Sequence, residues 1–289
     1  MNERKRAHTV AEYQALDSRI FTATKPPEFN VRSTDVVITP YAKSGTTWLQ
    51  QIFHCLRTRG DMDFDDISRV VPWLEVSHYV GIDLNIDQRA EPRGFKSHAP
   101  ADQVPHGCRY INSIRNPKDV AWSLYQFMLG WFIEPGTVSA DEFVRGDFLM
   151  KGEYFKHLVS WWPRRSDENV LFLAYEQMRQ DLEGTIHKVA RFSGIAMDSE
   201  LLALTMEHAS LPFMQAHIDR FDDRLLRDLT ELEVLPHGSD SAKVRTGQVG
   251  EHQEGLGADV IEEIEREWAE QITPVLGYAN YEALLEALV

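Results

Sequence analysis

Three short stretches of this sequence carry side chains suited to bind an anion and to move a proton. Residues 43–47, KSGTT, place a lysine, hydroxyls and a glycine shortly after the β-branched run at residues 36–38. Lys96 and His98 lie two positions apart, so in an extended chain both face the same side. Arg115 follows a second apolar run and offers paired N–H groups to a phosphate. Together these residues predict a site for a phosphate ester whose charge is held by side chains.

The KSGTT stretch reads as a turn between a buried strand and an amphipathic helix. N–H groups at the start of such a helix, with the helix dipole behind them, bind an anion. The register differs from the P-loop of nucleotide triphosphatases, because Thr46 stands where that motif has its lysine and Pro40 where it has its first glycine. We find no later strand ending in an aspartate for Mg²⁺, so we expect no metal. The alternative is an ordinary strand-turn-helix corner with a solvated lysine.

The other two stretches also admit a structural interpretation. A single histidine is more often structural than catalytic, and the lysine two residues before His98 favours the catalytic role. Arg115 is followed by Asn-Pro and by a predicted helix, from which Ser123 offers a hydroxyl to the same anion. The alternative for Arg115 is a surface pair with Asp119.

Apolar runs and amphipathic segments alternate along the chain. Short strands are predicted at residues 36–38, 93–98, 109–114 and 170–175, and helices at 10–19, 46–57, 117–128, 154–162, 182–193, 201–208 and 260–275, with a helical tail from 281. We expect a loop over residues 130–146. This alternation predicts an α/β fold with a central parallel sheet flanked by helices. Ligands of such sheets bind at the carboxyl ends of the strands, where all three stretches fall.

Length, charge and cysteine content limit the class of protein. The 289 residues show no repeat and no convincing linker, so we expect a single domain over residues 1–289. The formal net charge of −15 argues against a nucleic-acid or anionic-membrane partner. Two cysteines make a disulfide framework improbable, and no apolar run is long enough to span a membrane. We therefore expect a cytoplasmic protein without membrane association.

Five motifs occur in an order that resembles the cytosolic sulfotransferases, which use 3′-phosphoadenosine-5′-phosphosulfate (PAPS). They are YAKSGTTW at 41–48, KSH at 96–98, RNPKDVAWS at 115–123, LAYEQM at 173–178 and RTGQVGE at 245–251. One such match would be weak, whereas the ordered set covers residues 35–255. The resemblance implies transfer of a sulfuryl group from PAPS to a hydroxyl or amine of a small acceptor. It also implies a P-loop-like loop for the phosphosulfate.

The resemblance assigns roles to residues of this chain. It implies that the 5′-phosphosulfate is held by Lys43, Ser44, Gly45, Thr46 and Thr47, that Trp48 and Tyr175 lie near the adenine, and that the 3′-phosphate is bound by Arg115, Ser123, Arg245, Thr246 and Gly247. His98 is then the catalytic base. Lys43 donates to the oxygen between sulfur and phosphorus, and Lys96 stabilises the transferring oxygens.

The sequence departs from the family pattern at several positions. Ala42 replaces a proline of the first loop, Thr246 replaces a lysine of the last motif, and His252 replaces a tryptophan. The segment that pairs many family members is largely absent from residues 253–262, so the oligomeric state stays open. The acidic residues 219–235 fall where the family has a mobile loop over the acceptor, and we expect a lid there.

Two rival functions and the acceptor complete these expectations. A nucleotide-kinase-like phosphotransferase shares the strand-loop-helix but would need ATP and Mg²⁺. A non-catalytic nucleotide-binding protein would not need the base His98. Aromatic residues between the motifs predict an apolar pocket for a hydrophobic hydroxyl compound, and they are Trp73, Tyr79, Phe127, Trp131 and Phe132.

Overall fold

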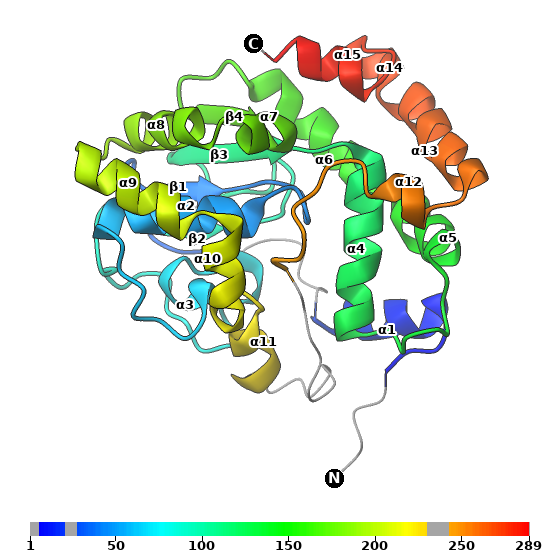
Figure 1. Cartoon of the computed structure of the whole chain (residues 1–289), viewed down its shortest axis with the longest axis horizontal. Helices are drawn as coiled ribbons and strands as arrows, with labels where there is room; N and C mark the ends of the chain where they lie inside the picture. Colours follow the sequence, from blue (N-terminus) through cyan, green and yellow to red (C-terminus); the bar gives the residue numbers. More distant parts are fainter. Residues whose placement is uncertain (1–5, 21–27, 230–242, 289) are drawn as a thin grey trace.

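The structure, a computed structural model, describes residues 6–20, 28–229 and 243–288. Its centre is a sheet of four parallel strands in the order β2-β1-β3-β4 (Figure 1). The strands are β1 (Val36–Ile38), β2 (Gly94–Lys96), β3 (Arg109–Ile114) and β4 (Val170–Ala174). These are the four strands expected from the apolar runs. The parallel α/β fold is therefore confirmed.

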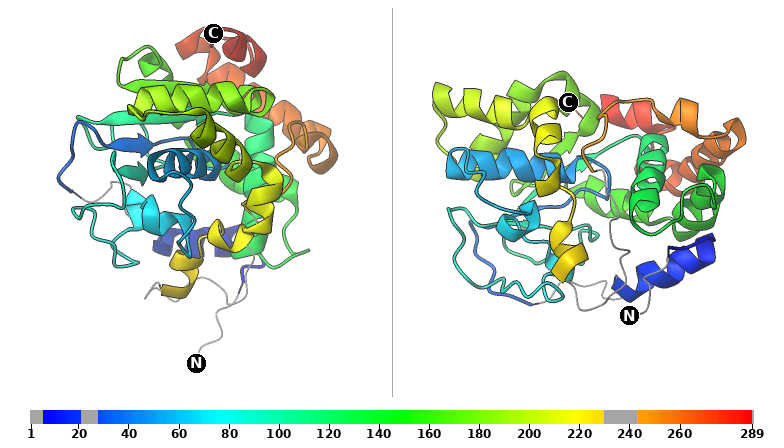
Figure 2. Two further views of the ribbon diagram at one scale, coloured as in Figure 1. Left: turned by 60° about the vertical axis from the view of Figure 1, so that its left-hand side comes forward. Right: turned by 60° about the horizontal axis from the view of Figure 1, so that its bottom comes forward.

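Helices cover both faces of the sheet, and the strand residues alternate between the two covers. Val36 and Ile38 belong to a core with α2 (Thr46–Thr58), α8 (Leu182–Ser193) and α9 (Ser199–His208). Val37, between them, belongs to a second core with α4 (Pro117–Trp131) and α6 (Glu153–Trp161). Figure 2 shows these layers from two further directions. Successive side chains of β1 therefore point to opposite faces of the sheet, as in any strand.

Shorter elements connect and extend these layers. They are α1 (Val10–Ile20), α3 (Ile67–Val70), η1 (Leu74–Val76), α5 (Ala140–Phe143), the π-helix η2 (Val144–Leu149), η3 (Trp162–Arg164), α7 (Tyr175–Gln180), α10 (Leu211–Ala216), η4 (Ile218–Arg220), α11 (Arg224–Leu229), α12 (His252–Gly255), α13 (Ala258–Gln271), α14 (Thr273–Leu276) and α15 (Tyr281–Glu286). No helix in the described part of the chain is both long and apolar enough to cross a membrane.

Two sequence expectations about elements were wrong. Residues 130–146 are not only a loop, because α5 begins there with a reciprocal cap between Ser139 and Glu142. The helix expected over 260–275 is divided into α13 and α14, and Pro274 lies in the first turn of the second piece. The expected lid at 219–235 lies partly outside the described residues. Its described part forms η4 and α11.

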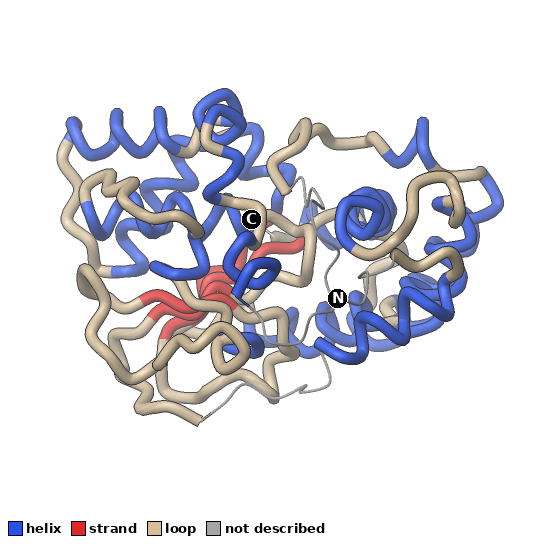
Figure 3. Tube along the Cα trace, turned by 90° about the horizontal axis from the view of Figure 1, so that it is seen from below, coloured by secondary structure: helices blue, strands red, loops and turns tan. Residues whose placement is uncertain are grey.

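The strand order places a crevice at the end of β1. The chain leaves β1 toward β2 on one side, and it leaves β3 toward β4 on the other side. In parallel sheets, ligands bind where the connections diverge in this way, outside the carboxyl ends of the strands. Figure 3 shows the strands between their helices from below. The KSGTT loop follows β1 and Arg115 follows β3, so both stretches lie at this crevice.

Candidate active site

The loop after β1 has a backbone shaped to receive an anion. Lys43 and Gly45 both have positive φ angles, 66° and 94°. Gly45 precedes α2 and contributes no side-chain cap, so the first N–H groups of this helix are open to a ligand. The Ser113 hydroxyl donates to the Ser44 carbonyl at 2.5 Å and ties the loop to β3. A strained lysine backbone held in this way is typical of functional sites.

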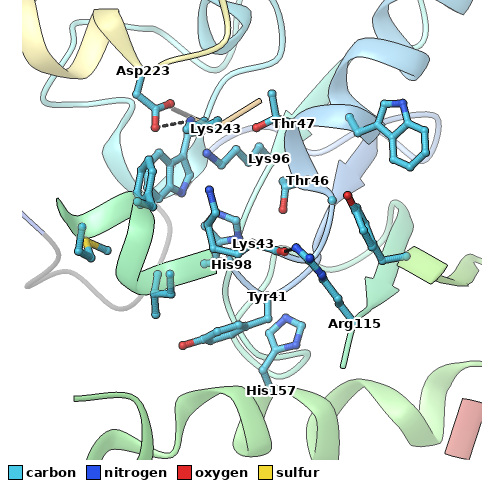
Figure 4. A pocket seen from close by; sticks show the side chains of 18 of the residues that line it. Tyr41, Lys43, Thr46, Thr47, Lys96, His98, Arg115, His157, Asp223 and Lys243 are labelled. Atoms are coloured by element: carbon cyan, nitrogen blue, oxygen red, sulfur yellow. Dashed lines mark hydrogen bonds and ion pairs between the residues drawn. The ribbon is translucent and has the colours of Figure 1, made fainter. Parts of the chain in front are cut away.

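Most of the predicted site residues line one cavity of about 540 Å³ beside this loop (Figure 4). Those residues are Lys43, Gly45, Thr46, Thr47, Trp48, Lys96, His98, Arg115, Tyr175, Arg245 and Gly247. They come from five separate parts of the chain, the loop after β1 with the start of α2, the end of β2, the turn after β3, the start of α7 after β4, and the stretch before α12 (residues 243–251). The fold thus brings together residues that the sequence separates by up to two hundred positions.

Ser44, Ser123 and Thr246 lie outside the described lining of this cavity. Ser44 is fully buried, while Ser123 is partly buried within α4. Thr246 directs its hydroxyl to Glu251, which also pairs with Arg245 at 2.5 Å. The roles expected for these three residues stay predictions.

His98 is held in the form that a general base requires. Its Nδ1 lies 2.7 Å from the carbonyl oxygen of Pro40. A carbonyl can only accept, so Nδ1 carries the proton and Nε2 is left with its lone pair. Burial, with help from the charge of Lys96, lowers the pKa of His98 well below its usual value. The imidazole is therefore neutral at physiological pH and ready to accept a proton.

Lys43 and Lys96 lie against aromatic rings of the same cavity. The Lys43 ammonium is 4.4 Å from the ring centre of Phe127, and that of Lys96 is 3.7 Å from Trp73. Burial lowers the pKa of Lys43 well below its usual value and that of Lys96 to about 7. Both ammonium groups are thus poorly solvated, and an anion bound between them would favour their charged forms.

Arg115 joins the loop after β1 to the stretch before α12. Its two terminal nitrogens donate to the carbonyls of Lys43, at 3.2 Å, and Gln248, at 2.9 Å. Its guanidinium lies over the Tyr175 ring at 4.4 Å, and the Tyr175 hydroxyl donates to the Gly247 carbonyl at 3.2 Å. The Asp119 carboxylate lies 3.9 Å from a terminal nitrogen of Arg115. The ion pair considered as the alternative role of Arg115 therefore also exists, but it is buried and does not lie on the surface.

The lining of the cavity also contains charged residues for which the sequence predicted no individual role, among them Glu75, Asp223 and Lys243. Glu75 accepts hydrogen bonds from the Ser97 hydroxyl and from the His98 N–H, the latter at 3.2 Å. It thereby fixes the backbone that carries the base. Asp223 pairs with Lys243. Lys243 belongs to a basic stretch visible in the sequence, whereas nothing local marks Glu75 or Asp223.

The expected acceptor pocket is present in part. Trp73, Phe127 and Trp131 line the cavity together with Leu124 and Met128. Two other aromatic residues that were expected there, Tyr79 and Phe132, lie outside the described lining and belong to or pack against the core. The cavity therefore combines the cations near the KSGTT loop with an aromatic wall of Trp73, Phe127 and Trp131, of which Trp73 meets the His98 ring edge to face at 5.3 Å.

The fold and the site define a parallel α/β protein with a strand-loop-helix suited to an anionic group. A family model described as the sulfotransferase domain matches residues 33–273. Canine sulfotransferase 1B1 is 32% identical over 242 residues, which cover 78% of each chain. Bovine sulfotransferase 1E1 is 30% identical over 260 residues, which cover 85% of each chain. The chain belongs to the sulfotransferase family, as its motifs indicated, and is an enzyme of that class.

Solved structures agree on the fold. Retinol dehydratase, crystallised with androsterone and the inactive cofactor PAP, superposes with a TM-score of 0.67 at 20% identity, covering 92% of this chain and 87% of that one. Mouse sulfotransferase SULT7A1, complexed with PAP, gives a TM-score of 0.61 at 22% identity, covering 96% and 92%. At these identities the likeness supports the shared fold alone.

Proposed function

We propose that this enzyme transfers the sulfuryl group of PAPS to a hydroxyl, or an amine, of a small hydrophobic acceptor and releases 3′-phosphoadenosine-5′-phosphate (PAP). The observation that carries this proposal is the meeting of a neutral histidine, with its Nε2 free, and two poorly solvated lysines in one cavity. The histidine suits the acceptor's proton. The lysines suit the charge of the donor.

The residues present fit this donor. Thr46 Oγ1 and Arg115 Nε are buried without a hydrogen-bond partner among the described residues, as expected of groups that await a polar ligand. The α2 N-terminus and Lys43 would hold the 5′-phosphosulfate. Arg115 and Arg245 would hold the 3′-phosphate. Trp48 and Tyr175, whose rings meet edge to face at 5.9 Å, would border the adenine.

The chain's own groups account for an in-line transfer. Bound PAPS supplies a sulfuryl group joined to phosphate through a bridging oxygen. His98 Nε2 takes the proton of the acceptor hydroxyl while the acceptor oxygen bonds to sulfur. Lys43 donates to the bridging oxygen, which keeps the electron pair of the broken sulfur–oxygen bond. Lys96 stabilises the equatorial oxygens. Most of the rate would come from positioning and preorganised charge.

The aromatic wall indicates the class of acceptor. Trp73, Phe127 and Trp131 line the cavity, and the Trp73 ring meets the His98 ring edge to face at 5.3 Å. Such a lining favours a flat or elongated apolar molecule with one hydroxyl directed at the base. The retinol dehydratase structures that share the fold contain androsterone in one case and retinol in the other. A phenol, a sterol or a lipid alcohol is the acceptor class that we propose.

The donor is tested by calorimetric titration of the purified protein with PAP in EDTA. ATP with Mg²⁺ serves as the comparison. We expect tight binding of PAP without metal and weak binding of ATP. The reverse preference would refute the proposal in favour of a kinase-like phosphotransferase, which shares the strand-loop-helix.

The role of His98 is tested with the variant His98→Ala. General-base catalysis typically contributes about 10²–10⁴-fold, so we expect turnover to fall by that factor. PAP affinity should change little, because the base faces the acceptor. A large loss of PAP affinity would place His98 in the donor site instead and contradict this role.

A further inference from the structure

The ion pair between Asp223 and Lys243 is a buried feature of the cavity that the proposed mechanism does not use. The two side chains are 2% and 8% exposed, and both line the cavity. Figure 4 shows Lys243 beside Lys96, on the side of the cavity that also holds His98. A buried lysine with a buried carboxylate is costly to maintain, so its position calls for a reason.

Asp223 is fixed from outside the site. The N–H of Leu225, two residues on, donates at 2.8 Å to the carboxylate of Asp66. Asp66 is itself buried and caps α3 through the N–H of Ser68 at 2.7 Å. Burial alone would raise the pKa of Asp223, but the charges of Lys243 and Lys96 lower it instead. Asp223 is therefore a charged, anchored partner for the Lys243 ammonium.

The charge of Lys243 acts on both predicted catalytic lysines. After burial, its charge is the largest influence that lowers the pKa of Lys43 and of Lys96. It also disfavours protonation of His98, with burial and Lys96 as the larger causes. Three ammonium groups thus converge on one region of the cavity. Such crowding is unfavourable unless an anion occupies the space between the groups.

The carboxylates nearby do not neutralise the positive charge of these three lysines. Asp223 pairs with one of the three lysines. Glu75 and Asp66 form no ion pair among the described residues, because their oxygens accept hydrogen bonds from Ser97, His98, Ser68 and Leu225 instead. An ammonium carries three N–H groups, so Lys243 retains donors after its contact with Asp223. Lys243 lines the cavity together with Lys43 and Lys96, so these donors are available to a ligand bound there.

We propose that Lys243 is a third cation of the transfer centre, which contacts the sulfonate oxygens of the bound donor, and that Asp223 is the residue that positions it. The inference rests on the proposed function, since it requires PAPS as the donor. The stretch before α12 then contacts the donor at two places. Arg245 serves the phosphate end of the nucleotide, and Lys243 serves the group that is transferred.

The experiment compares two ligands that differ only in the sulfonate. PAP and PAPS are titrated separately into the full chain without acceptor, at low temperature, and PAPS is checked by chromatography after each run. In Lys243→Met we expect the Kd for PAPS to rise about tenfold or more, as for the loss of a charge-assisted hydrogen bond. The Kd for PAP should stay within about twofold. Lys243→Arg should retain most of the PAPS affinity.

The controls separate contact from structure. Lys188→Met removes an exposed lysine of α8 and should alter neither affinity. Asp223→Asn should weaken PAPS more than PAP, and this effect should disappear when Lys243 is already methionine, because a positioning residue acts only through its partner. Thermal unfolding of each variant reports any general loss of structure.

Each outcome decides the proposal. Unchanged PAPS affinity in Lys243→Met would overturn it. Equal losses for PAP and PAPS would assign Lys243 to the nucleotide or to the loop, which also overturns the sulfonate contact. Failure of the unmodified protein to bind PAP would instead refute the proposed function. That result is distinguishable because it appears before any substitution is made.

Discussion

Among single residues, Lys96 has the chemistry that is most sensitive to solution conditions. Its ammonium is buried, lies on the Trp73 ring and has a pKa of about 7. Free enzyme above that pH therefore contains mainly neutral Lys96. A bound anion favours the charged form and raises the pKa toward the ordinary value. Donor binding and protonation of this side chain are thus linked.

This linkage predicts proton uptake when PAPS binds at pH 8 in the absence of acceptor, because Lys96 faces the sulfonate oxygens. The 3′-phosphate of free PAPS is already ionised there, so the proton taken up must enter the protein, and Lys96 alone would account for about one. The measurement is calorimetry in buffers of different ionisation enthalpy. Affinity for PAPS should fall as pH rises through 7 and above. In Lys96→Met the uptake should decrease by the share due to Lys96; an unaltered uptake would contradict the assignment.

At the scale of elements, the turn from β1 into α2 is the least tolerant part of the site. Gly45 combines a φ of 94° with a close approach to the Tyr175 ring, where an added Cβ would lie 3.1 Å from Cδ2. Tyr175 in turn supports Gly247 through its hydroxyl. A side chain at Gly45 would therefore disturb both walls of the donor site.

For Gly45→Ala we expect a loss of about 1–3 kcal/mol in the free energy of unfolding, from the strained backbone. A clear loss of PAP affinity should accompany it. Gly81→Ala is the matched control, because Gly81 also has a positive φ, 68°, and its Cβ would meet no atom within 4 Å. The Gly81→Ala variant should lose stability but keep its affinity for PAP. Denaturant unfolding and PAP titration measure the two effects, and equal PAP affinities in both variants would contradict this account.

Elements were predictable from the sequence wherever local patterns determine them. The runs at 36–38 and 109–114 became β1 and β3 with the same bounds. Lys96 and His98 reached one cavity as the strand period required. The pair of Asp223 and Lys243 was not predictable, because the two residues are twenty positions apart and only the folded chain brings them together.

Across the whole molecule, the charge of the chain opposes the charge of its site. The net charge is −15, while the cavity gathers Lys43, Lys96, Lys243, Arg115 and Arg245. A multiply charged anion approaching from solution meets the net field first and the local cations only near the cavity. The association rate and the dissociation rate of such an anion should therefore depend differently on salt concentration.

We expect the association rate constant of PAP to rise as salt is added from about 0.01 M to 0.15 M, because the Debye length falls from about 30 to 8 Å and the long-range repulsion is screened. The dissociation rate should change less, since the buried cations are poorly screened. Stopped-flow measurements test both rates. A steady decrease of the association rate with salt would show that the local basic field dominates at long range.

The contact between Lys96 and Trp73 has an optical consequence. An ammonium 3.7 Å from an indole ring perturbs its excited state, and a donor that draws the lysine toward its own oxygens would remove that perturbation. Occupancy of the transfer centre would then be readable as a change in intrinsic tryptophan emission. The enzyme would carry its own reporter for screening candidate donors and acceptors, without a radioactive or chromogenic label.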